Sequence, residues 1–334
     1  MVSRYGTPLI HCWAVLVPAA RRNRKPSARR VLPATFLLCR AIAILGAGFS
    51  ALLISGNHFV NSPQLAFIGA GNMASALIGG LVKQGFAAAR IIASDPMPAM
   101  LDKLSAIAPV RRTSDNVEAI ANADVVVLAV KPQVMKQVLQ PLADILQQRR
   151  PLIISIAAGI EIASIEHWLG GQLPIVRCMP NTPALVQLGA TGLFANAAVS
   201  AAQRELADAI LRAVGIALWV DSEAQLDAVT AVSGSGPAYF FMVMEAMQAA
   251  GEQLGLATDT AKLLTLQTAL GAARMALDSD VDTAELRRRV TSPNGTTERA
   301  IASFEADDLR GIFARALTAC CDRSEQLARE LGSS

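Results

Sequence analysis

Three segments carry residues whose types and spacing could bind a redox cofactor and a small polar substrate. The first is Gly69-Ala70-Gly71-Asn72-Met73-Ala74, the G-x-G-x-x-A form of the dinucleotide fingerprint. The second is Ser233-Gly234-Ser235-Gly236-Pro237, and the third is Thr291-Ser292-Pro293-Asn294-Gly295-Thr296-Thr297. A cofactor loop accompanied by two loops rich in glycine and hydroxyl groups indicates a reductase.

The fingerprint has a physical reason at each position. Its first glycine permits a tight turn, its second lets a pyrophosphate approach the backbone, and Ala74 lets the next helix pack on the sheet. The N-terminus of that helix attracts the phosphate charge. Asp95 follows Ala74 by 21 positions, where an acidic residue usually accepts a hydrogen bond from the ribose 2′-hydroxyl.

The two hydroxyl-rich loops predict a carboxylate site. The glycines of 233–236 free backbone N–H groups, the serines add hydroxyls, and Pro237 starts a helix where no donor is needed. Backbone amides and a helix dipole can hold a carboxylate. In the third loop, Thr296 or Thr297 is expected to cap the helix that runs through Glu298 to Phe304. A plain helix start remains the alternative for both loops.

The elements that would position these loops alternate between strands and helices. Buried strands are expected at 65–68, 90–95, 124–130, 152–156 and 175–179. In doubly wound sheets ligands bind beyond the carboxyl ends of the strands, where the polar and glycine-bearing loops of this chain fall. Because the strands are in phase with the fingerprint, we expect a nucleotide-binding Rossmann domain; an α/β domain without ligand is the alternative.

After about residue 200 the strand pattern fades into helices. Residues 201–214 are expected to be helical and 217–220 to form a short last strand, followed by helices at 237–251, 254–277 and 309–331. Helices this apolar need a partner surface, which favours a helix-swapped or side-by-side dimer. Met242, Met244 and Met247 recur near helical spacing and are expected in a core or interface, not a cofactor site.

Composition narrows the possible functions. The 334 residues suffice for two domains, and the net charge of +3 comes from a basic cluster at 21–30, so the rest shows no nucleic-acid footprint. No metal site, Cys-His nucleophile pair or disulfide framework is expected, and a reduced cytoplasmic protein is the default. The residues behind that expectation are Cys12, Cys39, Cys178, Cys320, Cys321, His11, His58 and His167.

Residues 1–62 fall outside the predicted domains. The apolar run 41–55 is short for a membrane span, and a basic region before an apolar one resembles a signal peptide. Three interpretations stay open: a true start at Val60, a processed or anchoring segment, and a soluble extension. Gly46-x-Gly48-x-x-Ala51 also fits the dinucleotide pattern, but no ribose-binding strand follows at the right distance.

Several ordered motifs resemble the pyrroline-5-carboxylate reductase family over residues 63–330. They are 67–73, 129–132, 155–159, 179–184, 227–230, 233–239 and 291–297. The resemblance implies an α/β chain in which an N-terminal Rossmann dinucleotide-binding domain precedes an all-α dimerisation domain. Its expected parts are a leader (1–62), the Rossmann domain (63–180), a connecting segment (181–222) and a helical substrate-binding and dimerisation domain (223–330).

The resemblance further implies reduction of L-1-pyrroline-5-carboxylate to L-proline, the last step of proline biosynthesis, by a homodimer or larger homo-oligomer. NADPH, NADH or both would serve as cofactor, with no metal, no nucleic acid and no stable membrane partner. Thr297 would be catalytic and hydrogen-bond the ring nitrogen. The substrate would also contact Ser233, Gly234, Ser235, Gly236 and Thr296. The cofactor would contact Gly69, Ala70, Gly71, Asn72, Met73, Ala74, Asp95, Asn116, Ala129, Val130, Lys131 and Pro132.

Two positions depart from the family pattern. Asn294 stands where glycine is frequent, but asparagine tolerates positive φ better than most residues. Asp95 stands where some relatives carry serine near the NADP 2′-phosphate. A carboxylate there should repel that phosphate and favour NAD, whereas the family commonly prefers NADPH, so both cofactors are expected to serve.

Three other functions are possible alternatives for this sequence. A 3-hydroxyacid dehydrogenase of the 6-phosphogluconate type favours a catalytic lysine on the helical domain, but Lys262 is the only lysine after Lys136 and no motif surrounds it. A regulatory protein that senses nicotinamide would predict erosion of the loops at 233 and 291. The third possibility is a membrane-tethered form that uses residues 31–55.

Overall fold

The computed structural model describes residues 62–332. The expected leader, the Val60 start, the second glycine pattern and the segment 31–55 lie outside the described residues. None of the helices within 62–332 is both long and apolar enough to cross a bilayer.

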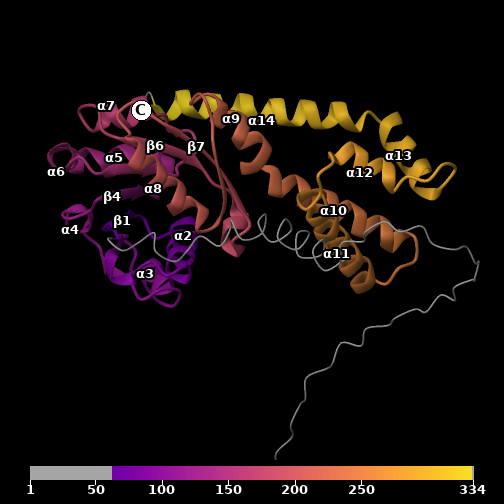
Figure 1. Cartoon of the computed structure of the whole chain (residues 1–334), viewed down its shortest axis with the longest axis horizontal. Coiled ribbons are helices and arrows are strands. Elements are labelled where there is room, and N and C mark those ends of the chain that lie inside the picture. Colours follow the sequence, from indigo (N-terminus) through magenta and orange to yellow (C-terminus); the bar gives the residue numbers. More distant parts are fainter. Residues whose placement is uncertain (1–61, 333–334) are drawn as a thin grey trace, which may run out of the picture. The chain divides into compact units, whose positions relative to one another are not determined.

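Eight strands form one sheet in the order β3-β2-β1-β4-β5-β6-β7-β8. Figure 1 labels β1, β4, β6 and β7 of this sheet. Strands β1 to β6 pair in parallel, β7 runs antiparallel to β6, and β8 runs parallel to β7. The order 3-2-1-4-5-6 is that of a Rossmann fold, so the predicted fold class is confirmed. The strands are β1 (Leu65–Ile68), β2 (Ile91–Ser94), β3 (Arg111–Thr113), β4 (Val125–Leu128), β5 (Leu152–Ser155), β6 (Ile175–Met179), β7 (Gly189–Ala195) and β8 (Gly215–Trp219).

The central strands are continuous apolar runs because helices cover both faces of the sheet. One face is covered by α2 (Asn72–Lys83), α3 (Pro98–Ser105) and α8 (Ala201–Arg212), and the other by α4 (Asn116–Ile120), α5 (Met135–Leu139), α6 (Ala143–Arg149) and α7 (Ile162–Trp168). Phe67 and Val127 belong to the buried cluster under α2, α3 and α8. Leu128 and Ile153 belong to the buried cluster under the other four helices.

The sheet is larger than the sequence predicted. The exposed Arg-Arg-Thr of β3 shows no apolar pattern, and β7 contains two glycines that weaken a strand signal. The predicted last strand at 217–220 is β8, which begins two residues earlier. As a result, the segment 181–222, expected to connect two domains, contributes β7 and β8 to the sheet and α8 to the helices that cover one of its faces.

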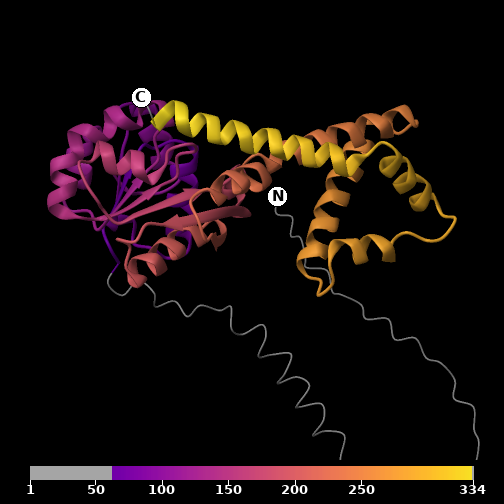
Figure 2. The ribbon, with the colours of Figure 1, turned by 90° about the horizontal axis from the view of Figure 1, so that it is seen from above.

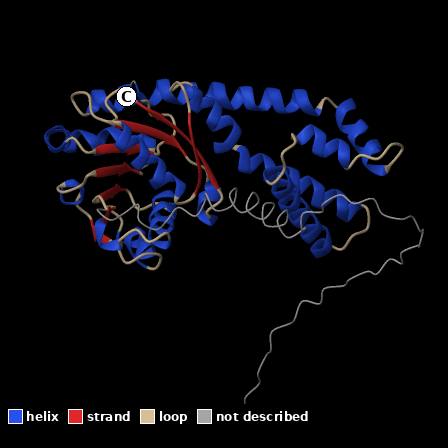
Figure 3. Ribbon diagram, in the orientation of Figure 1, coloured by secondary structure: helices blue, strands red, loops and turns tan. Residues whose placement is uncertain are grey.

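After β8 the described chain is helical, as predicted (Figure 3). The predicted helix at 254–277 begins only at Thr258, because α10 ends at Gln253 and Gly255 adopts a φ of +97°. The last helix is a single long element (Figure 2). The helices are α9 (Gln225–Val229), a π-helical turn (Thr230–Gly234), α10 (Gly236–Gln253), α11 (Thr258–Leu277), α12 (Thr283–Arg289), α13 (Thr296–Ala306) and α14 (Leu309–Gly332).

The C-terminal helix packs back on the earlier elements. The Ser324 hydroxyl of α14 donates a 2.6 Å hydrogen bond to the buried Asp227 carboxylate of α9. Leu327 and Leu331 approach Gly159, the glycine in the loop after β5, so closely that an added Cβ there would touch both. These contacts fasten α14 at both α9 and a loop at the carboxyl edge of the sheet.

Candidate functional site

The fingerprint loop lies where three strand ends meet. The Gly69 N–H donates to the Ser94 carbonyl at 2.7 Å, and the Ala129 N–H donates to the Ile68 carbonyl at 2.8 Å. Gly69 has a φ of +101°, and a Cβ there would lie 2.6 Å from the Ala129 carbonyl oxygen. Only glycine fits this position, so the tight turn expected from the sequence is present.

The start of α2 fits a phosphate group. Its N-cap is Gly71, which provides no side-chain cap, and the first turn of the helix contains no acidic residue. A Cβ built on Gly71 would have no atom within 4 Å, so the backbone faces open space there. Unsatisfied N–H groups at a helix start attract a dinucleotide pyrophosphate, and the residues present therefore fit a nicotinamide dinucleotide.

Asp95 follows β2 directly, and Asn116 is the first residue of α4 beside the same strand end. The Asp95 carboxylate accepts the Ala70 N–H through Oδ2 and the Met97 N–H through Oδ1, both at 2.9 Å. A carboxylate offers about four acceptor positions, so Asp95 retains capacity for a ribose hydroxyl. The Ser94 hydroxyl donates to Asn116 Oδ1 at 2.7 Å, which fixes that amide at the same edge.

The remaining predicted cofactor residues follow β4. A Val130 methyl lies 3.2 Å from the position of a Cβ at Gly69, and exposed Lys131 precedes the short turn that begins at Pro132. The structure thus brings the twelve predicted cofactor residues to one edge of the sheet, the carboxyl ends of the parallel strands.

The Ser233–Gly236 segment differs from the loop that was expected. Residues Thr230–Gly234 form a π-helical turn that continues α9, and the Ser233 hydroxyl donates to the Val229 carbonyl at 3.0 Å. The Ser235 N–H likewise donates to the Thr230 carbonyl at 2.8 Å. The Ser233 hydroxyl, one of the groups predicted to hold a carboxylate, therefore already donates within the helical segment, as serine hydroxyls readily do to the carbonyl one turn back.

Asn181 fixes this turn against the sheet. Its side-chain amide donates to the Ser233 carbonyl and accepts the Ala190 N–H, both at 2.9 Å, and only 8% of the residue is exposed. At Gly234 an added Cβ would lie 2.6 Å from the Met179 methyl, so the flexible Met179 side chain would have to move to admit a side chain there. Asn181 belongs to the 179–184 motif, but spacing assigns it no role, because its partner Ser233 is 52 positions away.

Cys320, a residue of α14, also contacts this turn. Ser235 Oγ and Cys320 Sγ are hydrogen-bond partners 3.3 Å apart. Partial burial and hydrogen bonding with Cys320 raise the pKa of the Tyr239 phenol, while its hydrogen bond with Ser235 opposes that rise. Sequence spacing carried no signal for this contact, because Cys320 comes 85 positions after Ser235.

The Thr291–Thr297 loop ends in a helix start without a side-chain cap. The N-cap of α13 is the extended Gly295, so the prediction that Thr296 or Thr297 caps this helix is wrong. Both threonines are exposed, and no hydrogen bond identified within residues 62–332 uses either hydroxyl. Asn294 adopts a φ of +58°, as its residue type allows, and its N–H donates to the Glu298 carboxylate at 2.7 Å.

The two hydroxyl-rich segments are held separately. Asn181 and α14 hold the Ser233–Gly236 turn, whereas α12 and the first turn of α13 hold the Thr291–Thr297 loop. Within the described part of the chain, no identified hydrogen bond or ion pair joins one segment to the other.

Comparison with known proteins adds independent evidence. A family model described as pyrroline-5-carboxylate reductase dimerisation matches residues 223–327, and one described as NADP oxidoreductase, coenzyme F420-dependent, matches residues 64–159. A pyrroline-5-carboxylate reductase of Pseudomonas aeruginosa is 61% identical over 273 residues, which cover 82% of this chain and 100% of that relative. One from Vibrio alginolyticus is 43% identical and covers 80% and 98%.

Solved structures agree with these matches. The pyrroline-5-carboxylate reductase of Coxiella burnetii superposes with a TM-score of 0.78 at 50% identity, covering 80% of this chain and 99% of that chain. The pyrroline carboxylate reductase of Plasmodium falciparum, solved with NADP bound, superposes with a TM-score of 0.71 at 30% identity, covering 80% and 98%. The chain belongs to the pyrroline-5-carboxylate reductase family of NAD(P)H-dependent oxidoreductases.

Proposed function

We propose that this chain reduces L-1-pyrroline-5-carboxylate to L-proline at a site built from two helix starts that lack side-chain caps. The start of α2 receives the cofactor pyrophosphate, and the start of α13 receives the substrate carboxylate. This pair of helix starts without side-chain caps is the observation that supports the proposal most strongly. The cofactor domain then extends over residues 63–222, since the sheet runs to Trp219, and the substrate domain over 223–330.

Each cofactor loop contacts a different part of the dinucleotide in this proposal. Gly69 to Ala74 hold the pyrophosphate, Asp95 and Asn116 lie toward the ribose, and Ala129 to Pro132 line the adjoining loop. The Ala70 N–H already donates to Asp95, so Ala70 contributes to the shape of the loop through that bond. Asp95 is therefore the residue that we expect to govern the choice between NADH and NADPH.

The substrate residues have separate tasks in the proposal. When bound, the dihydronicotinamide supplies a hydride, which adds to C5 of the cyclic imine. The C=N double bond becomes a single bond, and the ring nitrogen ends with the proton of a secondary amine. The Thr297 hydroxyl hydrogen-bonds that nitrogen and relays its proton, while the Thr296 N–H holds the carboxylate. The Ser233–Gly236 turn lies close to the carboxylate and shapes that wall of the pocket.

We further propose a homodimer, and larger assemblies of dimers, as the active form. Apolar side chains on α10 and α11 are strongly exposed in the single chain, including Phe241 at 64%, Met242 at 74% and Leu263 at 67%. Exposed apolar patches of this kind mark protein interfaces. A second copy that covers them could bring its Thr291–Thr297 loop to the Ser233–Gly236 turn of the first. The free thiols of Cys178, Cys320 and Cys321 fit a reducing cytoplasm.

Purified protein assayed with pyrroline-5-carboxylate and each cofactor tests the function. We expect oxidation of NADH and NADPH to match proline formation mole for mole, because each hydride makes one proline. Absence of proline with both cofactors, from protein that is folded by circular dichroism, would overturn the proposal.

A further inference from the structure

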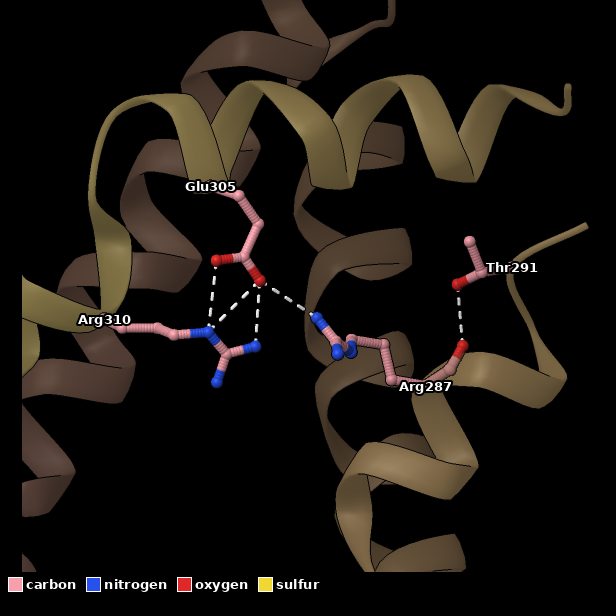
Figure 4. Close-up of polar contacts among 4 residues, drawn as sticks. All are labelled: Arg287, Thr291, Glu305 and Arg310. Atoms are coloured by element: carbon pink, nitrogen blue, oxygen red, sulfur yellow. Dashed lines mark hydrogen bonds and ion pairs between the residues drawn. The ribbon is translucent and has the colours of Figure 1, made fainter. Parts of the chain in front are cut away.

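Three charged side chains join the helices on either side of the Thr291–Thr297 loop (Figure 4). Glu305, in the last turn of α13, accepts a hydrogen bond from Arg287 Nη1 at 3.1 Å. Its two carboxylate oxygens also accept three contacts from Arg310, through Nε at 3.2 and 3.1 Å and through Nη2 at 2.8 Å. Glu305 thereby links α12, α13 and α14.

Arg287 holds the entry of the same loop. Its carbonyl oxygen accepts the Thr291 hydroxyl at 2.7 Å (Figure 4). The same oxygen accepts the Val290 N–H at 3.3 Å, where α12 ends. The backbone of Arg287 therefore fixes the first residue of the loop, while its guanidinium reaches α13 through Glu305. Thr297 and Glu305 lie on the same helix, about 12 Å apart at 1.5 Å per residue.

We propose that Glu305 is a positioning residue for the substrate loop. With Arg310 holding its carboxylate, Glu305 ties α13 to Arg287 and so sets the direction of the helix start that presents Thr296 and Thr297. The Asn294–Glu298 hydrogen bond closes the loop locally, but the Arg287–Glu305 pair fixes α13 relative to α12. This inference rests on the proposed function, because it assumes that the loop binds the substrate carboxylate.

The two guanidinium groups of Arg287 and Arg310 stabilise the negative charge of Glu305. The arginine contacts lower the pKa of the Glu305 carboxyl, with the Arg310 hydrogen bond as the largest cause, so Glu305 is ionised at neutral pH. The Arg287 and Glu305 side chains are 38% and 44% exposed, and exposed ion pairs contribute modestly. The expected effect of losing the pair is therefore a rise of about two- to fivefold in the substrate KM.

The test compares Glu305→Gln and Arg287→Gln with the wild type in steady-state kinetics. Both variants should raise the KM for pyrroline-5-carboxylate while the KM for NADH or NADPH and the kcat stay unchanged, because the cofactor loops lie on other elements. Arg287 reaches Glu305 through a single nitrogen, so Arg287→Lys should restore a KM near that of the wild type. The double variant should be no worse than Glu305→Gln alone, because Glu305→Gln already removes the Arg287–Glu305 pair.

Glu330→Gln provides the matched control. Glu330 is an exposed glutamate that pairs with Arg323 on α14, so the same substitution removes a similar ion pair without touching the loop. It should leave the substrate KM unchanged. If Glu305→Gln does not fold, Arg287→Gln makes the same test with the Glu305–Arg310 contacts intact.

The outcomes separate the two proposals. Wild-type protein that forms no proline refutes the function itself. If the wild type is active, a substrate KM that is unchanged in Glu305→Gln or Arg287→Gln refutes the positioning role. A KM raised equally in Glu330→Gln, or not restored in Arg287→Lys, refutes it as well.

Discussion

At the scale of single residues, the Thr297 hydroxyl has the most specific proposed task. Its oxygen takes part in no identified hydrogen bond within the described chain, and it lies in the first turn of a helix without a side-chain cap. Thr297→Val keeps the side-chain shape and removes the hydroxyl. We expect kcat/KM to fall about 10- to 100-fold, because a hydrogen bond to a charged group is lost.

Thr297→Ser is the control for this loss, since it keeps the hydroxyl and should stay within about threefold of the wild type. Steady-state kinetics with saturating cofactor measures both variants. A Thr297→Val enzyme with the wild-type kcat/KM would show that another group handles the proton on the ring nitrogen.

Asp95 gives a second prediction at this scale. Its carboxylate stays at the end of β2, where hydrogen bonds from Ala70 and Met97 hold it. A negative charge beside a 2′-phosphate is unfavourable, so Asp95→Ser should shift the ratio of kcat/KM values toward NADPH by about tenfold or more. The ratio measured with both cofactors is the readout. An unchanged ratio would mean that the carboxylate does not face the 2′ position.

Spacing predicted some of these residues and missed others for a physical reason. Gly69 and Asp95 belong to a local strand–turn–helix unit whose geometry fixes the distances along the chain. Asn181 acts on Ser233 and Cys320 acts on Ser235, across 52 and 85 positions. Only the folded chain brings such pairs together, so their contacts could not be predicted from spacing.

At the scale of elements, Asn294 tests how the loop backbone supports α13. Its φ of +58° lies in the left-handed region, which costs a β-branched residue roughly 1–2 kcal/mol. Asn294→Val should therefore lower the thermal midpoint and raise the substrate KM. Asn294→Gly removes the strain and should stay close to the wild type in both measurements. Equal behaviour of the two variants would show that the loop conformation does not control substrate binding.

Acid sensitivity is a second property of these elements. Hydrogen bonds from Arg289 and Arg310 are the largest causes that lower the pKa values of Glu285 and Glu305. A carboxyl whose pKa is lower in the folded than in the unfolded state stabilises the fold above its unfolded pKa. That stabilisation is lost as the pH falls through the folded pKa.

Wild type and Glu305→Gln should therefore differ in thermal midpoint above about pH 5 and converge as the pH falls below the lowered folded pKa of Glu305. The difference should be small because the carboxylate is exposed. Thermal unfolding followed by circular dichroism across this range is the measurement. A difference that grows toward acid pH would contradict the assigned ion pair.

Apolar sequence patterns predict the buried strands of this sheet but not all of its other strands. Strands β1, β4 and β5 are buried on both faces, and their apolar runs identified them. By contrast, β3 is an exposed three-residue strand at the edge of the sheet, and β7 pairs antiparallel with β6 through a glycine-containing segment. Their strand character depends on pairing partners rather than on their own composition.

At the scale of the whole molecule, the exposed apolar faces of α10 and α11 require an explanation that one chain does not provide. The family model for dimerisation spans both helices. A helix that is apolar around most of its surface normally packs on more than one neighbour. The same faces account for the methionines at helical spacing, since Met242 and Met247 are 74% and 47% exposed in the single chain.

Met242→Asp should weaken the homodimer and, with it, the enzyme. A buried charge without a partner at the centre of an interface costs enough to raise the dimer dissociation constant about 30-fold or more.

Ile107→Asp is the control, because Ile107 is a 55% exposed apolar residue of the cofactor half, outside the dimerisation match. Sedimentation velocity over a dilution series, with activity assayed at each concentration, measures both effects. If the site needs loops from two copies, activity should fall in parallel with the dimer while circular dichroism stays unchanged. A folded monomer with full kcat/KM would show that one chain holds the complete site.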